Sequence, residues 1–132
     1  MMSPLFKKLN LGTHAVIHVL NAPESFEHEL TLLKGVSVRR SVSGSITFAM
    51  AFVITQAELD AASRKLIAGG AGDSVLWMVY PKRASRKYRC EFSRDSGWQV
   101  LAAAGFEPVR MVAVDEDWSA LRFRRAEHIR KT

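Results

Sequence analysis

Cysteine is almost absent from this chain, since its 132 residues include only Cys90. One cysteine cannot form a disulfide within the chain, and it cannot supply the thiolates of a cysteine-rich zinc site. Disulfide-stapled and cysteine–zinc domains are therefore excluded for a single chain, and the composition fits a reducing compartment. Arginines and lysines surround Cys90, which predicts a lowered thiol pKa, but no neighbouring histidine marks it as a nucleophile.

Long apolar runs are also missing from the sequence. No stretch approaches the ~20 residues that a membrane-spanning helix needs. No apolar segment follows Lys7 and Lys8, as it would in a secretory signal peptide. We therefore expect a cytoplasmic protein with no membrane partner.

The overall composition is that of an ordinary globular protein, with 48% apolar and 24% charged residues. A chain of this length can bury about two-thirds of the surface of its unfolded state. No repeat, linker or low-complexity tract divides the sequence. We therefore expect a single domain over residues 1–132, in which 126–132 is a frayed tail.

Glycine is missing from the turn that follows the first apolar run. Residues 15–20 are rich in β-branched side chains and predict a strand buried on both faces. The turn that ends this strand reads Asn21-Ala22-Pro23. In doubly wound sheets this turn approaches a cofactor's phosphates or ribose, where a side chain obstructs the ligand, and Pro23 has no amide hydrogen to donate. The turn therefore argues against a nucleotide-type cofactor.

Strands and helices are expected to alternate along the chain. The motif Thr55-Gln56-Ala57-Glu58 is a capping box that predicts the start of a helix, and Gly69 and Gly70 are expected to end it. Ser93 is expected to cap a later helix with Leu101 and Ala102 on its inner face. The predicted helices cover 3–9, 24–33, 55–68 and 93–104, and the predicted strands cover 15–20, 36–42, 46–54, 75–80, 106–114 and 119–125.

This order predicts an α/β fold with a doubly wound, mostly parallel sheet of about six strands. Helices are expected on both faces of the sheet, and an antiparallel hairpin is expected at the C-terminal end. In the last strand, Leu121 and Phe123 alternate with Arg122 and Arg124. This period of two is typical of a half-buried edge strand.

The turn of that hairpin carries three adjacent acids, Asp115-Glu116-Asp117. They point in different directions, so we expect them to cap the turn or to pair with Arg122 and Arg124 rather than to bind a metal. His14 and His18 would lie about 13 Å apart along a strand, too far to share one metal ion. We therefore expect no metal site.

The net charge of +6 is concentrated in two segments. Residues 82–94 hold six basic side chains against Glu91, and residues 122–131 hold five against Glu127. This distribution predicts an anionic partner, such as nucleic acid or a phosphorylated ligand, with a solvated surface as the alternative. Tyr88 is placed to stack on a base. The candidate anion-binding residues are Lys82, Arg83, Arg86, Lys87 and Arg89.

A small-molecule site is a further candidate, at the carboxyl ends of the strands. Ligands of open α/β sheets bind there, and Asn21, Glu24 and Lys82 follow predicted strands at that end. We expect these three side chains to converge on one crevice. Ordinary turn chemistry is the alternative explanation for Asn21 and Pro23.

The order of elements resembles the class I S-adenosylmethionine-dependent methyltransferase fold, which is Rossmann-like. The resemblance covers about residues 10–125 and lacks a helix and a strand between Val42 and Ile46. It is closer to a family of small bacterial proteins with a domain of unknown function. The shared motifs are Asn21-Ala22-Pro23, Tyr80-Pro81-Lys82 and Asp115-Glu116-Asp117-Trp118-Ser119-Ala120-Leu121-Arg122-Phe123.

The resemblance implies a fold but no established activity. Methyltransferases of this class need a glycine-rich first turn and an acid at the end of the second strand to hold the ribose. This sequence has Asn21-Ala22-Pro23 and Arg39-Arg40 at those places. We therefore expect a degenerate member of the fold, without a cofactor and without catalytic residues.

Three functions stay open at this point. The first is a non-catalytic binding or interaction module. The second is a nucleotide- or phosphate-binding protein, with enzymatic activity not excluded, that uses the strand-end crevice. The third is nucleic-acid binding through residues 82–94 and 122–131. The sequence predicts no oligomeric state.

Overall fold

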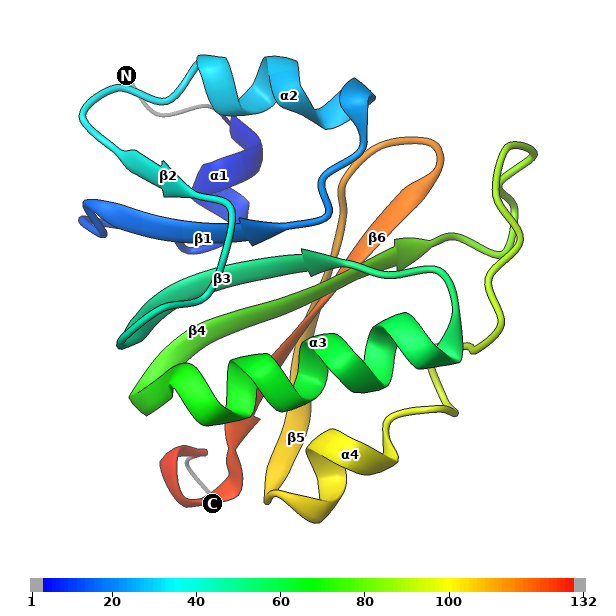
Figure 1. Ribbon diagram of the computed structural model, residues 1–132. Helices are drawn as coiled ribbons and strands as arrows, with labels where there is room; N and C mark the ends of the chain where they lie inside the picture. The colour runs from blue at the N-terminus through cyan, green and yellow to red at the C-terminus, as the bar shows by residue number, and fades with distance from the viewer. Residues whose placement is uncertain (1–3, 130–132) are drawn as a thin grey trace.

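The six strands found within residues 4–129 join a single sheet (Figure 1). The computed structural model describes residues 4–129, and the strand order is β2-β1-β3-β4-β6-β5. The strands β1 to β4 pair in parallel, whereas β6 is antiparallel to both β4 and β5. The strands are β1 (Val16–Leu20), β2 (Ser37–Arg39), β3 (Ile46–Phe52), β4 (Gly70–Pro81), β5 (Phe106–Ala113) and β6 (Trp118–Arg125).

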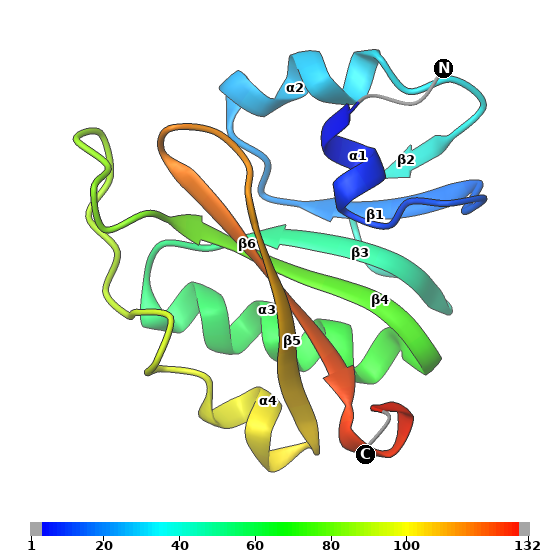
Figure 2. The same ribbon diagram turned by 180° about the vertical axis from the view of Figure 1, so that it is seen from behind.

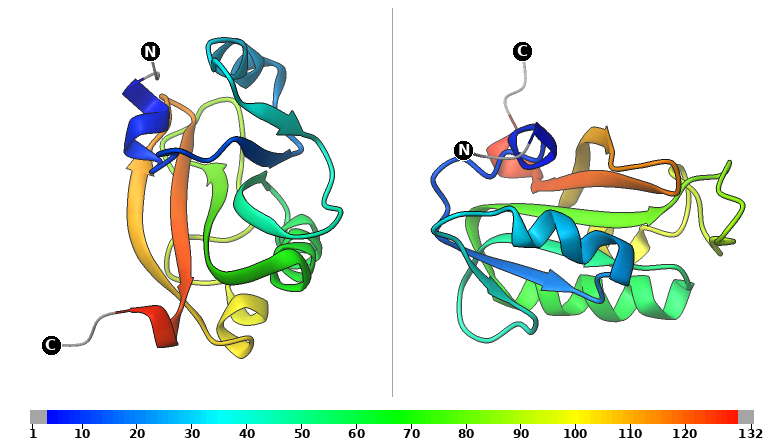
Figure 3. Two further views of the ribbon diagram at one scale, coloured as in Figure 1. Left: turned by 90° about the vertical axis from the view of Figure 1, so that its left-hand side faces the viewer. Right: turned by 90° about the horizontal axis from the view of Figure 1, so that it is seen from above.

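Helices cover both faces of this sheet (Figures 2 and 3). One apolar core joins the sheet to Phe6 of α1 and Phe26 of α2, and a second joins the opposite face to Leu66 of α3 and Leu101 of α4. The prediction of a doubly wound α/β fold with a C-terminal antiparallel pair is thus confirmed. The helices are α1 (Pro4–Lys8), α2 (Glu24–Thr31), α3 (Gln56–Gly69), α4 (Gln99–Ala103) and the 3₁₀ turn η1 (Ala126–His128).

No helix within residues 4–129 is long and apolar enough to cross a membrane.

In the predicted tail, 126–132, the first residues form η1, and the amide of Ala126 donates to the carbonyl of Gly105 at 2.8 Å. Residues 130–132 of that tail lie outside the described part of the chain.

The connection from β2 to β3 contains no helix and passes over β1. It consists of residues 40–45, where the resemblance implied a missing helix and strand. A hydrogen bond of 3.1 Å between His18 Nδ1 of β1 and the carbonyl of Ser41 holds the connection against the sheet. The strand β2 is shorter than the predicted 36–42 because Arg40 leaves the ladder and binds both carboxylate oxygens of Glu27 on α2.

The helix α3 passes directly into β4. It ends at Gly69, as predicted, and a Cβ on that residue would lie 2.6 Å from the side chain of Ile46. The close approach explains the glycine, since real Cβ atoms do not come so near. β4 begins five residues before the predicted 75–80, and the buried Ser74 hydroxyl donates to the Ile46 carbonyl at 2.7 Å.

Two sequence predictions about the last third of the chain are wrong. β6 is not an edge strand but lies between β4 and β5, so that β5 forms the edge. Ser93 does not cap α4, because residues 93–96 close a turn of their own and the helix begins at Gln99. Leu101 is buried as predicted, but Ala102 is exposed.

The predicted capping box of α3 is present. The Thr55 hydroxyl accepts from the amide of Glu58 at 3.0 Å, and Glu58 Oε1 accepts from the amides of Thr55 and Ile54, each at 2.9 Å. Thr55→Ala should therefore lower the free energy of unfolding by about 1 kcal/mol, because one helix-end amide loses its acceptor. Urea denaturation measures this loss. Thr31→Ala is the control, since its hydroxyl donates to a carbonyl of its own helix; an equal loss in both variants would contradict the prediction.

The same box predicts a dependence of stability on pH. Hydrogen bonds from the amides of Thr55 and Ile54 hold the pKa of Glu58 below its ordinary value of 4.5. A lowered pKa in the folded state stabilises the fold fully above the unfolded pKa, and the contribution disappears as the pH falls through the folded value. The difference in unfolding free energy between wild type and Glu58→Gln should thus be largest above pH 4.5 and shrink in acid. A difference that stays constant on acidification would count against this role.

Candidate functional site

The first of two cavities at the carboxyl side of the sheet lies beside Asn21. It has a volume of about 670 Å³ and is bounded by the end of β1, the connection 40–45 and one face of α3. Asn21 adopts a left-handed backbone with φ of 58°, which asparagine tolerates. The chain thereby turns at once into α2 on the far face of the sheet. The crevice beside Asn21 is therefore open and is not filled by Phe26, which packs in the opposite core.

The charge around this first cavity is close to balanced, because Arg40 is already paired with Glu27 of α2. Arg40 and Lys65 line it, and Glu58 is the only acidic side chain in its lining. Because Glu58 Oε1 already accepts from two backbone amides, this carboxylate is committed to the helix end. Sequence patterns pointed to neither Arg40 nor Lys65, although Glu58 and Lys65 are spaced so that they share a helix face.

The second cavity lies at the end of β4, under the basic loop, which we define as residues 82–97. Its volume is about 870 Å³. Tyr80 and Phe92 are buried and contribute aromatic rings with centroids 5.8 Å apart, and Met111 and Ser119 close the side formed by β5 and β6. The Tyr80 hydroxyl donates to Met111 Sδ at 3.5 Å. Its cationic lining residues are Lys82, Arg83, Arg89 and Arg94.

Hydrogen bonds hold the basic loop in place at both ends. The Lys82 amide donates to the carbonyl of Asp117 at 2.7 Å, and the Ser85 hydroxyl donates to the Asp117 carboxylate at 2.8 Å. Near the other end, Glu91 Oε1 accepts from the amide of Gln56 at the start of α3. The carboxylates of Asp117 and Glu91 are therefore each engaged in a hydrogen bond that ties the loop to a neighbouring element. Within residues 4–129, Lys82, Arg83 and Arg89 make no ion pair with a carboxylate.

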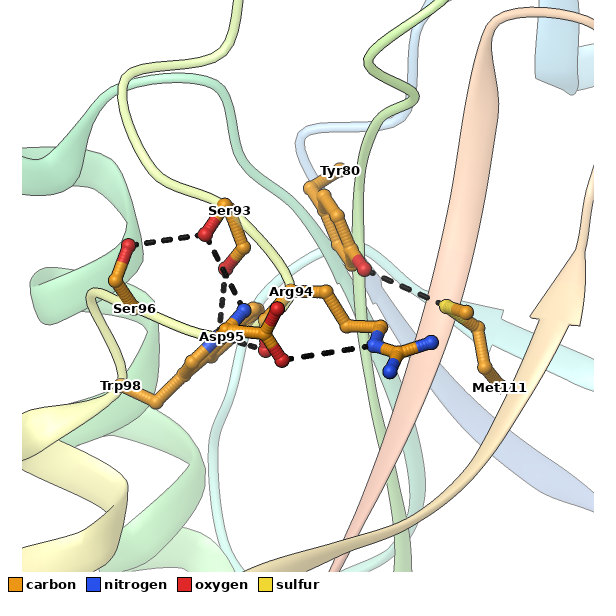
Figure 4. A network of polar contacts seen from close by, with 7 residues as sticks. All are labelled: Tyr80, Ser93, Arg94, Asp95, Ser96, Trp98 and Met111. Carbon is orange, nitrogen blue, oxygen red and sulfur yellow. Dashed lines mark hydrogen bonds and ion pairs between the residues drawn. The ribbon is translucent and has the colours of Figure 1, made fainter.

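The turn at residues 93–96 presents Arg94 to the cavity (Figure 4). The Ser93 and Ser96 hydroxyls lie 3.0 Å apart, and the Trp98 indole donates to the carbonyls of Ser93 and Arg94. Figure 4 shows the Arg94 side chain extending toward Tyr80 and Met111. Its Nε is 3.7 Å from the Asp95 carboxylate, and both side chains are largely exposed. Such an exposed pair contributes little energy, so Arg94 is available to a ligand.

Cys90 lines the second cavity, but its thiol is not activated. Burial raises the pKa of Cys90 above its ordinary value, and the charge of Glu91 adds to the rise, against a smaller lowering by the amide of Phe92. The predicted lowering by neighbouring basic residues is therefore wrong. The half-buried position of the sulfur outweighs the distant positive charges.

The structure does not bring the predicted crevice residues together. Asn21 lines the first cavity, Lys82 lines the second, and Glu24 lines neither. The strand β3 separates β1 from β4, which keeps the two strand ends apart. Among the predicted anion-binding residues, Arg86 and Lys87 lie on the basic loop but do not line the second cavity.

The acidic hairpin turn has one of the two roles that the sequence predicts. Asp115 Oδ1 accepts from the amides of Asp117 and Trp118, as expected for a cap. Of the two expected roles the structure shows capping, while Arg124 binds Asp73 of β4. In the described part of the chain, no group of three histidine, cysteine or acidic side chains is arranged to hold a metal ion.

Comparison with known proteins shows the fold alone. No protein-family model matches the sequence, and no curated protein is similar to it. The resemblance to a bacterial family of unknown function therefore stays a prediction. Many solved structures are similar in shape, and the identities of those compared below are too low to carry function across.

The N-methyltransferase NodS from Bradyrhizobium japonicum, in complex with S-adenosyl-L-homocysteine, superposes with a TM-score of 0.55 at 11% identity, over 94% of this chain and 89% of its own. The magnesium protoporphyrin IX methyltransferase from Synechocystis, with bound S-adenosylmethionine, superposes with a TM-score of 0.55 at 12% sequence identity. The match covers 92% of this chain and 74% of that chain. LepI in complex with S-adenosylmethionine gives 0.54 at 10%, over 93% of this chain but only 47% of its own. This chain thus has the fold of such methyltransferases and spans about half of the LepI chain.

The residues present do not fit the cofactor of that fold. The first turn carries side chains at Asn21 and Ala22 and lacks the Pro23 amide, where close approach to a ligand needs bare backbone. The end of β2 offers Arg39 and Arg40 in place of an acid for the ribose. The remaining acid, Glu58, is occupied by backbone amides. A cationic sulfonium cofactor would meet Lys65 in this cavity, and Glu58 is the one acidic side chain in the lining.

The raised pKa of Cys90 predicts slow alkylation. The rate of reaction with iodoacetamide should reach half of its maximum at a pH above the ordinary thiol value of 9.0, because the reactive thiolate is disfavoured by burial. Urea should abolish the difference from a free thiol. Measurement of the alkylation rate against pH tests this, and half-maximal reaction near neutral pH would show an activated cysteine.

Proposed function

We propose that this protein is a non-catalytic binding module that holds a small anion with an aromatic or apolar body in the second cavity. One observation carries the proposal: the cavity combines buried aromatic rings with four cationic side chains, three of which have no ion-pair partner within residues 4–129. Pockets of this size typically join apolar walls to a few polar groups that fix orientation.

Charge and geometry together support an anionic ligand. Arginine forks match phosphate and carboxylate oxygens in two-point contacts, and Lys82 adds a point charge at the strand end. Tyr80 and Phe92 line the same cavity and give it an aromatic wall, which suits an apolar or aromatic body. A nucleoside phosphate has both parts.

We propose that catalysis is absent because the residues at the cofactor positions of this fold do not suit the cofactor. The turn after β1 and the end of β2 carry residues unsuited to a sulfonium cofactor, and the thiol in the second cavity has a raised pKa. Function is set by the site and not by the fold. The methyltransferase-like sheet here serves as a scaffold for the basic loop.

The ligand prediction can be tested with ADP and adenosine as probes. ADP should bind, and the double variant Arg83→Gln/Arg89→Gln should weaken its binding about tenfold or more, because charge-assisted hydrogen bonds to phosphate are lost. The matched control is Arg86→Gln/Lys87→Gln, which removes the same charge from the same loop outside the cavity. Isothermal titration calorimetry measures both, and the control should stay within about twofold of wild type.

Three results would contradict this proposal. Adenosine binding as tightly as ADP would remove the role of the cations. Equal weakening in both double variants would indicate unspecific attraction by net charge, as in nucleic-acid binding through the basic segments. If the folded protein binds S-adenosylmethionine, this compound must raise the unfolding midpoint. Such a rise would show that the protein binds the cofactor of this fold after all.

A further inference from the structure

A cluster of arginines lies on the opposite face of the sheet from Tyr80 and Phe92 of the second cavity. Leu121 and Phe123 of β6 belong to the core under α3. Because side chains alternate between the two faces of a strand, Arg122 and Arg124 of β6 face the side of α1. Arg110 of β5 stands directly opposite Arg122. Trp77 of β4 flanks Arg122 on its other side and fixes α1 by donating its indole hydrogen to the Leu9 carbonyl at 2.9 Å.

The acidic partners near this cluster do not balance it. Arg124 forms a two-point contact with Asp73, with Nε 2.9 Å from Oδ1. Arg110 reaches only the neutral side chain of Asn10, at 3.3 Å. Glu107 stands opposite Arg124 but makes no ion pair in the described part of the chain. Within residues 4–129, Arg122 makes no ion pair, although the charge of Asp73 lies near enough to act on it.

Arg122 also carries an unsatisfied buried donor. Its Nε is buried and has no hydrogen-bond partner among residues 4–129. Like charges directly across an antiparallel pair destabilise the sheet, and a buried N–H without an acceptor costs free energy that the fold must recover elsewhere. Burial first, and then the charges of Arg124 and Arg110, lower the pKa of Arg122. An arrangement that breaks two local rules at one place marks these side chains as a candidate anion site.

We propose that Arg110 and Arg122 together bind a phosphate group, either free or within a phosphodiester backbone. Two guanidinium forks on neighbouring strands offer donors to several oxygens of one tetrahedral anion. The bound charge would also relieve the repulsion between the two side chains. Because these residues lie on the other face of the sheet from Tyr80 and Met111, this site is independent of the cavity under the basic loop.

Thermal unfolding in inorganic phosphate, compared with chloride at equal ionic strength, tests the site. At about ten times the dissociation constant, phosphate should raise the unfolding midpoint of the wild type by about 5 °C. The variant Arg110→Gln/Arg122→Gln should lose this rise. Arg64→Gln is the matched control, because this exposed arginine lies on α3 outside both sites and its loss removes charge only; it should respond as the wild type does.

A second arm with short single-stranded RNA distinguishes the source of the phosphate. A rise with RNA alone that depends on Arg110 and Arg122 would support the site with a phosphodiester as its ligand. If the double variant fails to fold, Arg110→Gln alone serves, since Arg110 is exposed on the edge strand and its loss should halve the rise or more. The proposal is overturned if neither probe raises the midpoint, or if the variants respond as strongly as Arg64→Gln.

Discussion

The insertion of β6 between β4 and β5 is the pairing on which both candidate sites depend. Its ladder to β4 runs from Pro81 opposite Trp118 to Leu76 opposite Phe123, and its ladder to β5 covers the length of that strand. On one face β6 brings Ser119 beside Tyr80 and the basic loop; on the other it brings Arg122 beside Trp77. The sheet's antiparallel part therefore carries chemistry on both sides.

Basic side chains line both cavities at the carboxyl side of the sheet. Arg40 and Lys65 line the cavity beside β1, and Lys82 and Arg83 line the cavity after β4. The available carboxylates are used structurally: Glu58 caps a helix, Glu91 binds a helix-end amide and Asp115 closes a turn. The two proposals of anion binding rest on this distribution of charge.

Local patterns were sufficient to predict most of the fold. The order of helices and strands, the capping box at Thr55 and the asparagine turn after β1 follow from short-range chemistry that the structure repeats. The position of β6 was mispredicted because alternation of apolar and charged residues also occurs in an inner strand when one face of the sheet is only partly covered. Strand order is a long-range property that periodicity does not contain.

The candidate site was predicted less completely, for the same reason. Lys82 and Arg83 were identified from charge density, but their separation from Asn21 depends on β3 lying between the strands. The pKa of Cys90 depends on burial under the loop, which no neighbour in sequence reveals. The unpaired Nε of Arg122 becomes visible only when Trp77 and Arg110 are placed beside it.

The two borders of the sheet bear on how the protein behaves at high concentration. At one border β2 offers only three residues, from Ser37 to Arg39, so few unpaired amides and carbonyls face outward. At the other, β5 carries Pro108, which has no amide hydrogen, and a register shift between Pro108 and Arg110. Short, charged and interrupted borders are poor templates for another strand. The borders of the sheet therefore disfavour edge-to-edge pairing between molecules, even though the edge strand β5 exposes Val109 and Met111.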